Sequence, residues 1–345
     1  MPDGMKKMQF GVMLRGVFPQ GDDMRTRFAE LMEQARLMET LGYDSLTKGS
    51  HFSAYPMQEM VQVPFLSRVM AECPSLRLNA GIVLLALHKP LEVAENFATM
   101  DLMSGGKMIF GCALGYRDVE FKGFGVERKG AVRRFEENLD AVKRLWSGGP
   151  VTMKGSHFEL EEARISVPLV QKPHPPIWLG ANADKAVERA ARLGDCWYLN
   201  PHQRLDTFQR QIEIYKRALD ASGKPFPKEL PMRREVFCAP THEEAVRVAG
   251  PFLKSMYEAY EDWGQDKVMP VGDNDISQRY EELAKDRFIV GSPDEVAEEM
   301  LRYHRLLGVN HIIMSVQGTG LPQSQVLDTF ELMAKEVFPK VRQGM

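Results

Sequence analysis

LGYDSLTKGSHFSAY, residues 41–55, joins the end of a helix to a buried strand and then to a histidine. In the preceding residues 24–41, apolar side chains recur on one face, which predicts an amphipathic helix. Gly42 is placed to end that helix as a C′ glycine, and the apolar run from Tyr43 to Thr47 predicts a strand. The polar loop after the strand contains Ser50 and His51. The stretch therefore predicts a helix, a strand and a candidate functional residue in direct succession.

The same alternation of strand and helix continues on both sides of this stretch. Helical patterns follow short apolar runs, which predict strands at residues 9–14, 43–47, 76–87, 107–112, 177–179, 196–199, 232–238 and 310–316. Eight β-α units favour a (β/α)8 TIM barrel over an open doubly wound sheet, although the pattern alone leaves both open. No boundary-like linker divides the chain, so we expect residues 1–345 to form a single barrel domain.

Two segments interrupt the alternation. Residues 150–175 hold short β-like pieces and end in KPHPP, which predicts a hairpin-like insertion. Residues 263–287 are rich in glycine, proline, aspartate and asparagine, and they predict a long irregular loop. Loops of this length are commonly lids or disordered segments, so we expect a mobile lid there.

Composition and charge narrow the class of protein. Lys and Arg total 44 against 47 for Asp and Glu, so no basic excess exists to bind nucleic acid or an anionic membrane. The four cysteines are far apart and form no CxxC pair, which indicates reduced thiols. The N-terminal apolar run is too short for a signal peptide, and no run of 18 apolar residues predicts a membrane span. We therefore expect a cytoplasmic protein.

Active sites of TIM barrels lie at the carboxyl ends of the strands, so polar residues at those points are the candidates for chemistry. His51 is the sharpest of them, because imidazole can donate, accept or shuttle a proton near neutral pH. The alternative is a histidine that a backbone carbonyl fixes at a strand end, and position alone does not decide between the two. The other candidates are Arg15, Ser50, His88, Gly115-Tyr116 and Gly180-Ala181-Asn182.

Several site types find no support in the sequence. The histidines form no H-E-x-x-H or H-x-H pair, so we expect no metal site. GFGVERKG, residues 123–130, does not fit G-x-G-x-x-G, and no P-loop motif occurs. An anion could instead bind at Gly180–Asp184, where a strand end turns into a helix N-terminus with free backbone N–H groups. The alternative there is that Asn182 caps the helix.

Four ordered motifs closely resemble the bacterial luciferase-like, flavin-dependent monooxygenase family. They are LGYDSLTKGSHF, RLNAGIVLLALHKPLEVAENFATMDLMSGGKMIFGCALGYRDVEFKGFG, KPHPPIWLGANADKAVERAARLGDCW and FIVGSPDEVAEEMLRYHRLLGVNHII. The resemblance implies a (β/α)8 barrel with insertions after the fourth helix and the seventh strand. It implies an enzyme that receives reduced FMN from a separate NAD(P)H:flavin reductase, adds O2 at flavin C4a to give a (hydro)peroxyflavin, and oxygenates a small apolar organic substrate. A homodimer is expected on the same analogy.

The resemblance also implies roles for particular residues. His51 matches the family's active-site histidine beside the flavin. Ala80-Gly81-Ile82 matches the strand end that faces the isoalloxazine ring, sometimes through a non-proline cis peptide. The stretches that match the surroundings of the FMN phosphate are Gly115-Tyr116 and Gly180-Ala181-Asn182.

Three positions depart from the family pattern. Leu114 replaces a phosphate-binding arginine, Ala183 replaces a serine, and Ser50 stands where an acidic residue often precedes the histidine. The departures keep two alternatives open, namely hydride transfer with the deazaflavin F420 and a non-catalytic flavin-binding protein. We expect the substrate pocket to be formed by Phe18, Phe52, Tyr55, Met57, Tyr116, Trp197 and Tyr198.

Overall fold

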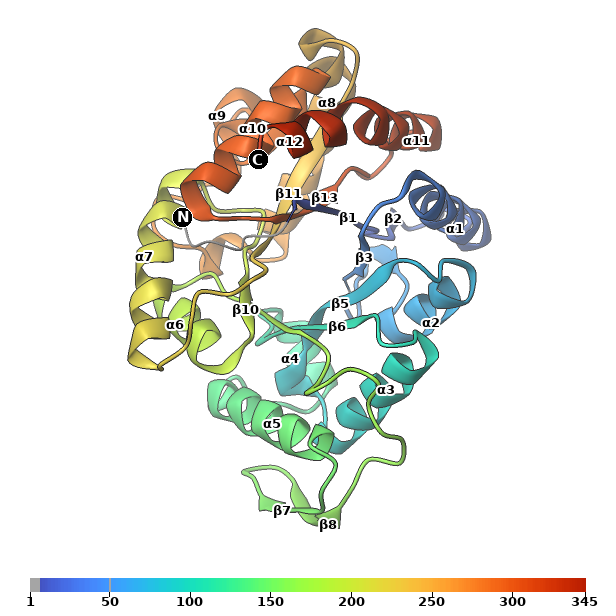
Figure 1. Cartoon of the computed structure of the whole chain (residues 1–345). Helices are drawn as coiled ribbons and strands as arrows, with labels where there is room; N and C mark the ends of the chain where they lie inside the picture. Colours follow the sequence, from blue (N-terminus) through green and yellow to red (C-terminus); the bar gives the residue numbers. More distant parts are fainter. Residues whose placement is uncertain (1–6, 50) are drawn as a thin grey trace.

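The computed structural model describes residues 7–49 and 51–345, and Ser50 therefore lies outside the described residues. The centre of the molecule is a curled parallel sheet of nine strands (Figure 1). In sheet order these strands are β10 (Cys196–Tyr198), β9 (Ile177–Gly180), β6 (Met108–Ala113), β5 (Arg77–Leu84), β3 (Ser45–Lys48), β1 (Gln9–Met13), β13 (His311–Ser315), β11 (Pro231–Cys238) and β12 (Phe288–Gly291).

The curl of the sheet brings β10 next to β11, which are the sixth and seventh strands in the predicted alternation of strand and helix. Leu199, which follows β10, forms a parallel bridge with Met232 on β11. The Leu199 N–H donates to the Pro231 carbonyl at 3.0 Å, and the Arg233 N–H donates to the Leu199 carbonyl at 2.9 Å. The strand β12 pairs with the outer end of β11, through Glu235 to Cys238. The arrangement is consistent with the TIM-barrel type, with β12 as an additional strand that the sequence reading missed.

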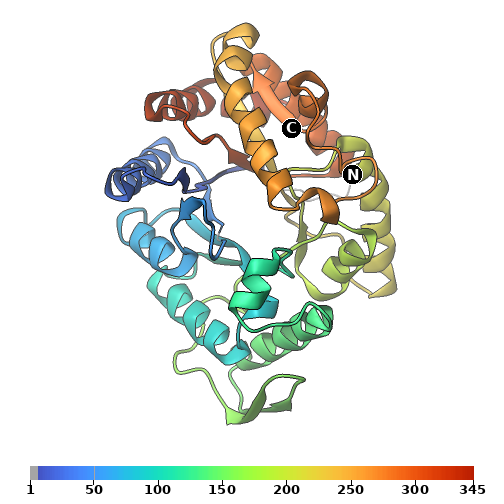
Figure 2. The same cartoon turned by 180° about the vertical axis from the view of Figure 1, so that it is seen from behind.

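Helices surround the sheet in a ring (Figures 1 and 2). Two helix ends carry residues that normally terminate or cap a helix. Gly42 ends α1 with a left-handed φ of 74°, and Ser292 and Glu295 form a capping box at the start of α10. The helices are α1 (Met24–Leu41), α2 (Gln62–Glu72), α3 (Pro90–Met103), α4 (Asp118–Gly123), α5 (Ala131–Trp146), α6 (Asp184–Leu193), α7 (Leu205–Ala221), α8 (His242–Asp262), α9 (Tyr280–Ala284), α10 (Pro293–Leu307), α11 (Gln323–Leu332) and α12 (Phe338–Gln343).

Two apolar cores follow from the alternation of side chains along the strands. The large core fills the space between the sheet and the helices. A small one lies inside the curl and consists of Met13, Ile109, Trp178, Cys196, Tyr198 and Ile313. All four cysteines are buried and free. Among the helices in residues 7–49 and 51–345, none is long and apolar enough to cross a membrane.

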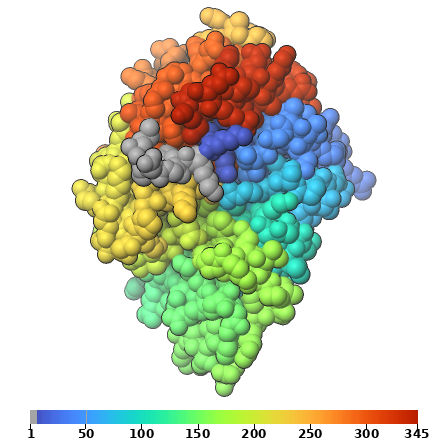
Figure 3. All heavy atoms as spheres, viewed as in Figure 1, coloured from blue at the N-terminus to red at the C-terminus, as the bar shows by residue number. Residues whose placement is uncertain are grey.

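The segments that interrupt the alternation have different structures. Residues 151–163 form an antiparallel hairpin of β7 (Val151–Lys154) and β8 (Glu159–Ala163). This hairpin projects at the foot of the molecule, away from the barrel (Figures 1 and 3). Residues 263–287 are not wholly irregular, because they contain the 3-10 turn η2 (Asp266–Val268) and α9. In Figure 2, α4 and the segment after α8 lie over the middle of the ring.

Candidate active site

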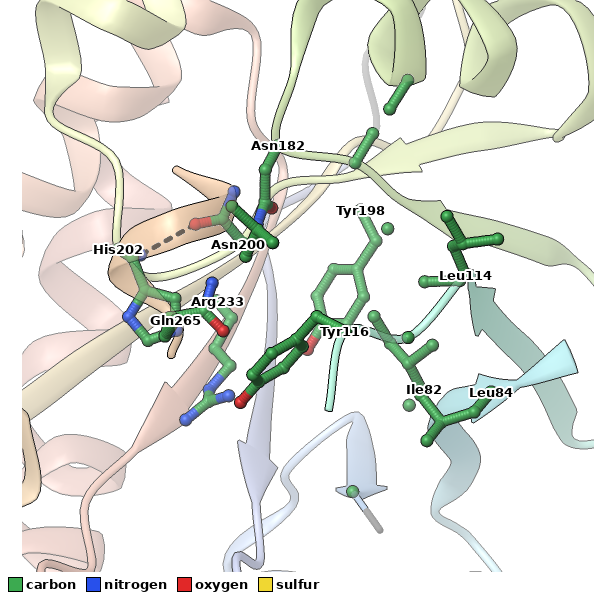
Figure 4. A pocket seen from close by; sticks show the side chains of 18 of the residues that line it. Ile82, Leu84, Leu114, Tyr116, Asn182, Tyr198, Asn200, His202, Arg233 and Gln265 are labelled. Atoms are coloured by element: carbon green, nitrogen blue, oxygen red, sulfur yellow. Dashed lines mark hydrogen bonds between the residues drawn. The ribbon is translucent and has the colours of Figure 1, made fainter. Parts of the chain in front are cut away.

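A cavity of about 380 Å³ opens at the carboxyl ends of the barrel strands. Its lining comes from the ends of seven strands and from the segment after α8, so residues far apart in the chain meet there (Figure 4). The location is the one that the barrel geometry predicts for a binding site. Of the residues predicted for the site, those that line the cavity are His51, Gly81, Ile82, Gly115, Tyr116, Gly180, Ala181, Asn182 and Tyr198.

One wall of the cavity is apolar. Ile82, Leu84 and Leu114 present aliphatic side chains from the ends of β5 and β6 (Figure 4). The peptide bond between Gly81 and Ile82 is cis, the feature that the family resemblance implies at this strand end. A Cβ at Gly180 would lie 2.5 Å from Cδ1 of Ile82, so only glycine leaves the isoleucine in place. The wall is therefore suited to a flat apolar group.

His51 lies at the edge of this cavity, and two carboxylates hold it. Its backbone N–H donates to Oε2 of Glu59 at 3.1 Å, and its Nδ1 lies 3.0 Å from Oε1 of Glu120. The same Glu120 oxygen accepts the backbone N–H of Phe52 at 3.0 Å, and the side chain of Glu120 is fully buried. Because a carboxylate oxygen can only accept, Nδ1 carries a proton and Nε2 remains for a ligand. Nε2 forms no hydrogen bond within the part of the chain that the structure describes.

Each of the two carboxylates that hold His51 has a buried cation as its neighbour. Lys48 Nζ donates to Glu59 at 3.0 Å and to the backbone carbonyls of Arg15 and Gly49. Burial lowers the pKa of Lys48, and the neighbouring Glu59 carboxylate opposes that shift. Arg117 lies 3.6 Å from Glu120, donates to the carbonyl of Phe52, and stacks 4.7 Å from the ring of Trp263. These contacts fix the loop that carries His51.

The strand-to-helix turn at residues 180–184 offers backbone donors. The N-cap of α6 is Ala183, which has no side-chain oxygen, so the prediction that Asn182 caps the helix is wrong. The first N–H groups of α6 thus lack a side-chain cap beside the cavity, whose lining also includes Arg128 and Arg189. Uncapped N–H groups and the helix dipole favour an anion such as a phosphate at this place.

Six predicted residues lie outside the cavity lining. Trp197 faces α7, where its ring packs 5.8 Å from Phe208, and its Nε1 donates to the carbonyl of Ala181. It points outward because side chains alternate along β10 and Tyr198 takes the inward position. Ala80 faces the outer core for the same reason on β5. The other four are Phe18, which packs in the main core, Phe52, which packs against His88 and Phe124, Tyr55, which is exposed, and Met57, which lies on β4 (Met57–Glu59). The structure therefore does not bring these six residues into the lining of the cavity.

The sequence reading missed most of the polar residues of the site. Glu120 and Trp263 contact His51, and Arg233, His202 and Tyr260 line the cavity's opposite side. Glu120 lies on a short helix and Trp263 follows a long one, so neither sits at a strand end. Arg233 could have been found, since β11 carries three consecutive charged residues, Arg233, Arg234 and Glu235, and charged residues are rarely buried in a strand. No group of three or more metal-binding side chains occurs within the described residues.

The family model described as luciferase-like monooxygenase matches residues 8–310. The chain belongs to the luciferase-like monooxygenase family. An FMNH2-dependent dimethylsulfone monooxygenase of Pseudomonas putida is 24% identical over 93% of this chain and 88% of its own length. An F420-dependent glucose-6-phosphate dehydrogenase of Amycolatopsis mediterranei is 24% identical over 91% of this chain and 94% of its own length.

The luciferase-like chain also matches solved structures along nearly its whole length. The crystal structure of monooxygenase RslO1 from Streptomyces bottropensis is 26% identical, with a TM-score of 0.81 over 96% of this chain and 99% of the other. Relatives named as monooxygenases and as F420-dependent enzymes thus share this fold and length. The protein is a flavin-dependent oxidoreductase of the monooxygenase type.

Proposed function

We propose that this protein is the oxygenase of a two-component system, which uses reduced FMN and O2 to oxygenate a small organic substrate. The observation that carries the proposal is the placement of His51. Glu120 orients its imidazole from outside the cavity, and the ring stands at the edge of a space with an apolar wall. Such an imidazole can hold or release one proton beside a bound flavin.

The residues present fit FMN. The aliphatic side chains of Ile82, Leu84 and Leu114 suit one face of an isoalloxazine ring, and Gly180 leaves space beside Ile82. The uncapped N-terminus of α6 suits the phosphate. The lining also includes Arg128, which pairs with Asp118 at 2.7 Å, and Arg189, which pairs with Glu136 at 2.9 Å. Since Leu114 replaces the family's arginine, backbone N–H groups carry more of that contact here. We infer that Gly115, Tyr116, Gly180, Ala181 and Asn182 surround the ribityl phosphate.

When bound, reduced FMN supplies the electrons and activates O2. The chain's own contribution is to orient the flavin, to exclude water and to place a proton donor. Trp263 lies 5.3 Å from His51 and Tyr116 lies 5.8 Å from it, both edge-on, so aromatic rings shield the imidazole from solvent. A dry site limits the loss of activated oxygen as hydrogen peroxide.

The proposal includes a partner. We propose that reduced FMN comes from a separate NAD(P)H:flavin reductase, since the relative from Pseudomonas putida is named as FMNH2-dependent. A homodimer and a cytoplasmic location remain predictions from the sequence.

His51→Ala tests the role of the imidazole. We expect FMN affinity to change by less than about threefold, while the fraction of O2 that is lost as hydrogen peroxide rises and the oxygenation rate falls by on the order of 10²-fold. The measurements are flavin fluorescence titration and a peroxide assay with a flavin reductase present. An unchanged peroxide yield would remove His51 from the reaction. His157→Ala, in the distant hairpin, is the matched control.

Hydride transfer with F420 is the second candidate, because the dehydrogenase of Amycolatopsis mediterranei aligns over the same length. The two functions differ in the cofactor that the cavity accepts. Titration of the protein with FMN and with F420 distinguishes them, since we expect binding of FMN and little binding of F420. Tight F420 binding with reduction by an alcohol supports the second candidate, and flavin binding without any turnover supports a non-catalytic protein.

A further inference from the structure

The side of the cavity across from the apolar wall is cationic. Arg15 follows β1, Arg233 lies on β11, and both guanidinium groups line the cavity. They meet at one tyrosine, because Arg15 stacks 5.1 Å from the ring of Tyr260 while Nη2 of Arg233 donates to the Tyr260 hydroxyl at 3.1 Å. We call Arg15, Arg233 and Tyr260 the arginine pole. In the order of the sheet, β1 and β11 lie on either side of β13, away from β5 and β6.

Arg15 is half-buried, and one end of its guanidinium group lacks the partner that a buried N–H group normally has. Nη1 of Arg15 is buried without a hydrogen-bond partner, and Arg15 forms no ion pair within residues 7–49 and 51–345. Burying an unpaired charge is costly, and native proteins keep such groups mainly where a ligand completes them. The missing partner of Arg15 is therefore an acceptor that is not part of this chain.

The charges around the pole do not neutralise it. Glu235 is the nearest acid, at 3.5 Å from Nη2 of Arg233, and Glu59 is already paired with Lys48. The cations Arg234 and Arg287 lie behind the pole, where backbone carbonyls hold their guanidinium groups. One carboxylate thus faces the two arginines of the pole. The remaining positive charge favours an anion in the cavity.

Further unpaired polar groups surround the same space. The hydroxyl of Tyr116 and Nδ1 of His202 are buried without a hydrogen-bond partner among the described residues. Burial, together with Arg233 and Arg15, holds the pKa of His202 well below its usual value, so its imidazole is neutral. Figure 4 shows Tyr116, His202 and Arg233 converging on one region of the cavity. A neutral imidazole and a phenol can each donate one hydrogen bond to an oxyanion.

We propose that the arginine pole binds the carboxylate of an amphipathic substrate, whose apolar part extends toward Ile82 and Leu84. This proposal rests on the proposed function and replaces the expected small apolar substrate with a small organic acid. Two guanidinium groups match the bidentate geometry of a carboxylate. The group to be oxygenated would then lie between the pole and the apolar wall, on the side of the cavity where His51 stands.

The phosphate of FMN is the competing occupant of the pole. We assign the phosphate to the other side of the cavity, because the uncapped α6 N-terminus lies there and the arginine pole does not. If the arginine pole held the phosphate, Arg15→Met would reduce the preference for FMN over riboflavin, which has no phosphate. If the phosphate lies on the other side, that preference stays unchanged.

Arg15→Met is the sharpest test, because the Arg15 side chain forms no hydrogen bond to the part of the chain that the structure describes. Calorimetry would measure the binding of carboxylates of four to ten carbons and of phenylacetate. The corresponding amide and the corresponding sulfonate of each carboxylate would be measured for comparison. The protein would be saturated with FMN and, separately, free of flavin. We expect at least one carboxylate to bind tenfold or more tighter than its amide, and Arg15→Met to weaken that carboxylate by about 10- to 100-fold while leaving the amide within about twofold.

Arg15→Lys and Arg133→Met are the matched variants. The lysine keeps the charge without the bidentate fork and should retain part of the preference, while Arg133 is an exposed arginine on α5 whose removal should change nothing. The proposal is overturned if no carboxylate exceeds its amide, if sulfonates bind tenfold better than carboxylates, or if the preference survives in Arg15→Met. It is also overturned if the FMN-to-riboflavin affinity ratio collapses in Arg15→Met. Carboxylate binding without oxygenation would contradict the proposed function alone.

Discussion

At the scale of single residues, one cluster resembles a catalytic triad and is structural. Ser45 Oγ lies 2.8 Å from Nε2 of His311, whose Nδ1 lies 2.8 Å from Oε1 of Glu229. Ser45 and His311 are fully buried at the amino ends of β3 and β13, and neither lines the cavity. Arg77 adds a bidentate pair to Glu229. A hydroxyl without access to substrate cannot act as a nucleophile, so the cluster locks the closed end of the barrel.

Glu229→Gln should lower the stability of the protein. Burial raises the pKa of Glu229, but the bonds from His311 and Arg77 outweigh it and hold the pKa at about 2 against an ordinary 4.5. The carboxylate therefore stabilises the fold fully above pH 4.5, and this contribution is lost progressively as the pH falls toward 2. We expect a loss of about 2–3 kcal/mol at pH 7 by urea unfolding, shrinking below pH 4.5.

Glu159→Gln is the control for this measurement, because its ion pair with Lys154 is largely exposed. It should change the free energy of unfolding by less than about 0.5 kcal/mol. A pH-independent difference between the wild type and Glu229→Gln would contradict the role assigned to the carboxylate.

At the scale of elements, we propose that the segment 263–287 closes over bound flavin. Gln265 and Val268 line the cavity, and Trp263 contacts both Arg117 and His51. The far end is anchored, since buried Arg287 donates to the carbonyl of His202 at 2.7 Å and lies 3.6 Å from Asp273. The part near Trp263 lines the cavity, so a ligand there would contact this part of the segment directly.

Limited proteolysis measures that response. We expect reduced FMN to slow cleavage within residues 263–287 several-fold, and Trp263→Ala to remove the protection, because the stacked contact with Arg117 contributes about 1 kcal/mol. Cleavage in the exposed hairpin of β7 and β8 should be the same with and without flavin and serves as the internal control. Equal cleavage of the segment in both conditions would rule out closure.

At the scale of the whole molecule, the repeat of apolar strands and amphipathic helices predicted the alternating strands and favoured the barrel, but it left the open doubly wound sheet as an alternative. Each of the eight predicted strands is present, because their apolar runs reflect burial on both faces. The strand β12 was missed because FIVG is short and follows a loop-like stretch. The end of α1 was predictable, because one residue, Gly42, decides it.

The site was predictable only in part. Residues at strand ends, such as His51 and Gly180, line the cavity as the barrel geometry requires. Trp197 was misplaced because an apolar run does not reveal which of two alternating side chains points inward. Glu120, Trp263 and the arginine pole depend on tertiary contacts between distant segments, and no local pattern carries that information.

The proposed function requires that this chain controls the reaction of reduced FMN with O2. The most direct measurement is stopped-flow absorbance of the flavin after anaerobic protein with reduced FMN is mixed with O2. We predict that the bound flavin returns to its oxidised spectrum at least about tenfold more slowly than free FMN, and that His51→Ala shortens this delay. Reoxidation at the rate of free FMN in the wild type, with flavin binding shown separately, would contradict the account.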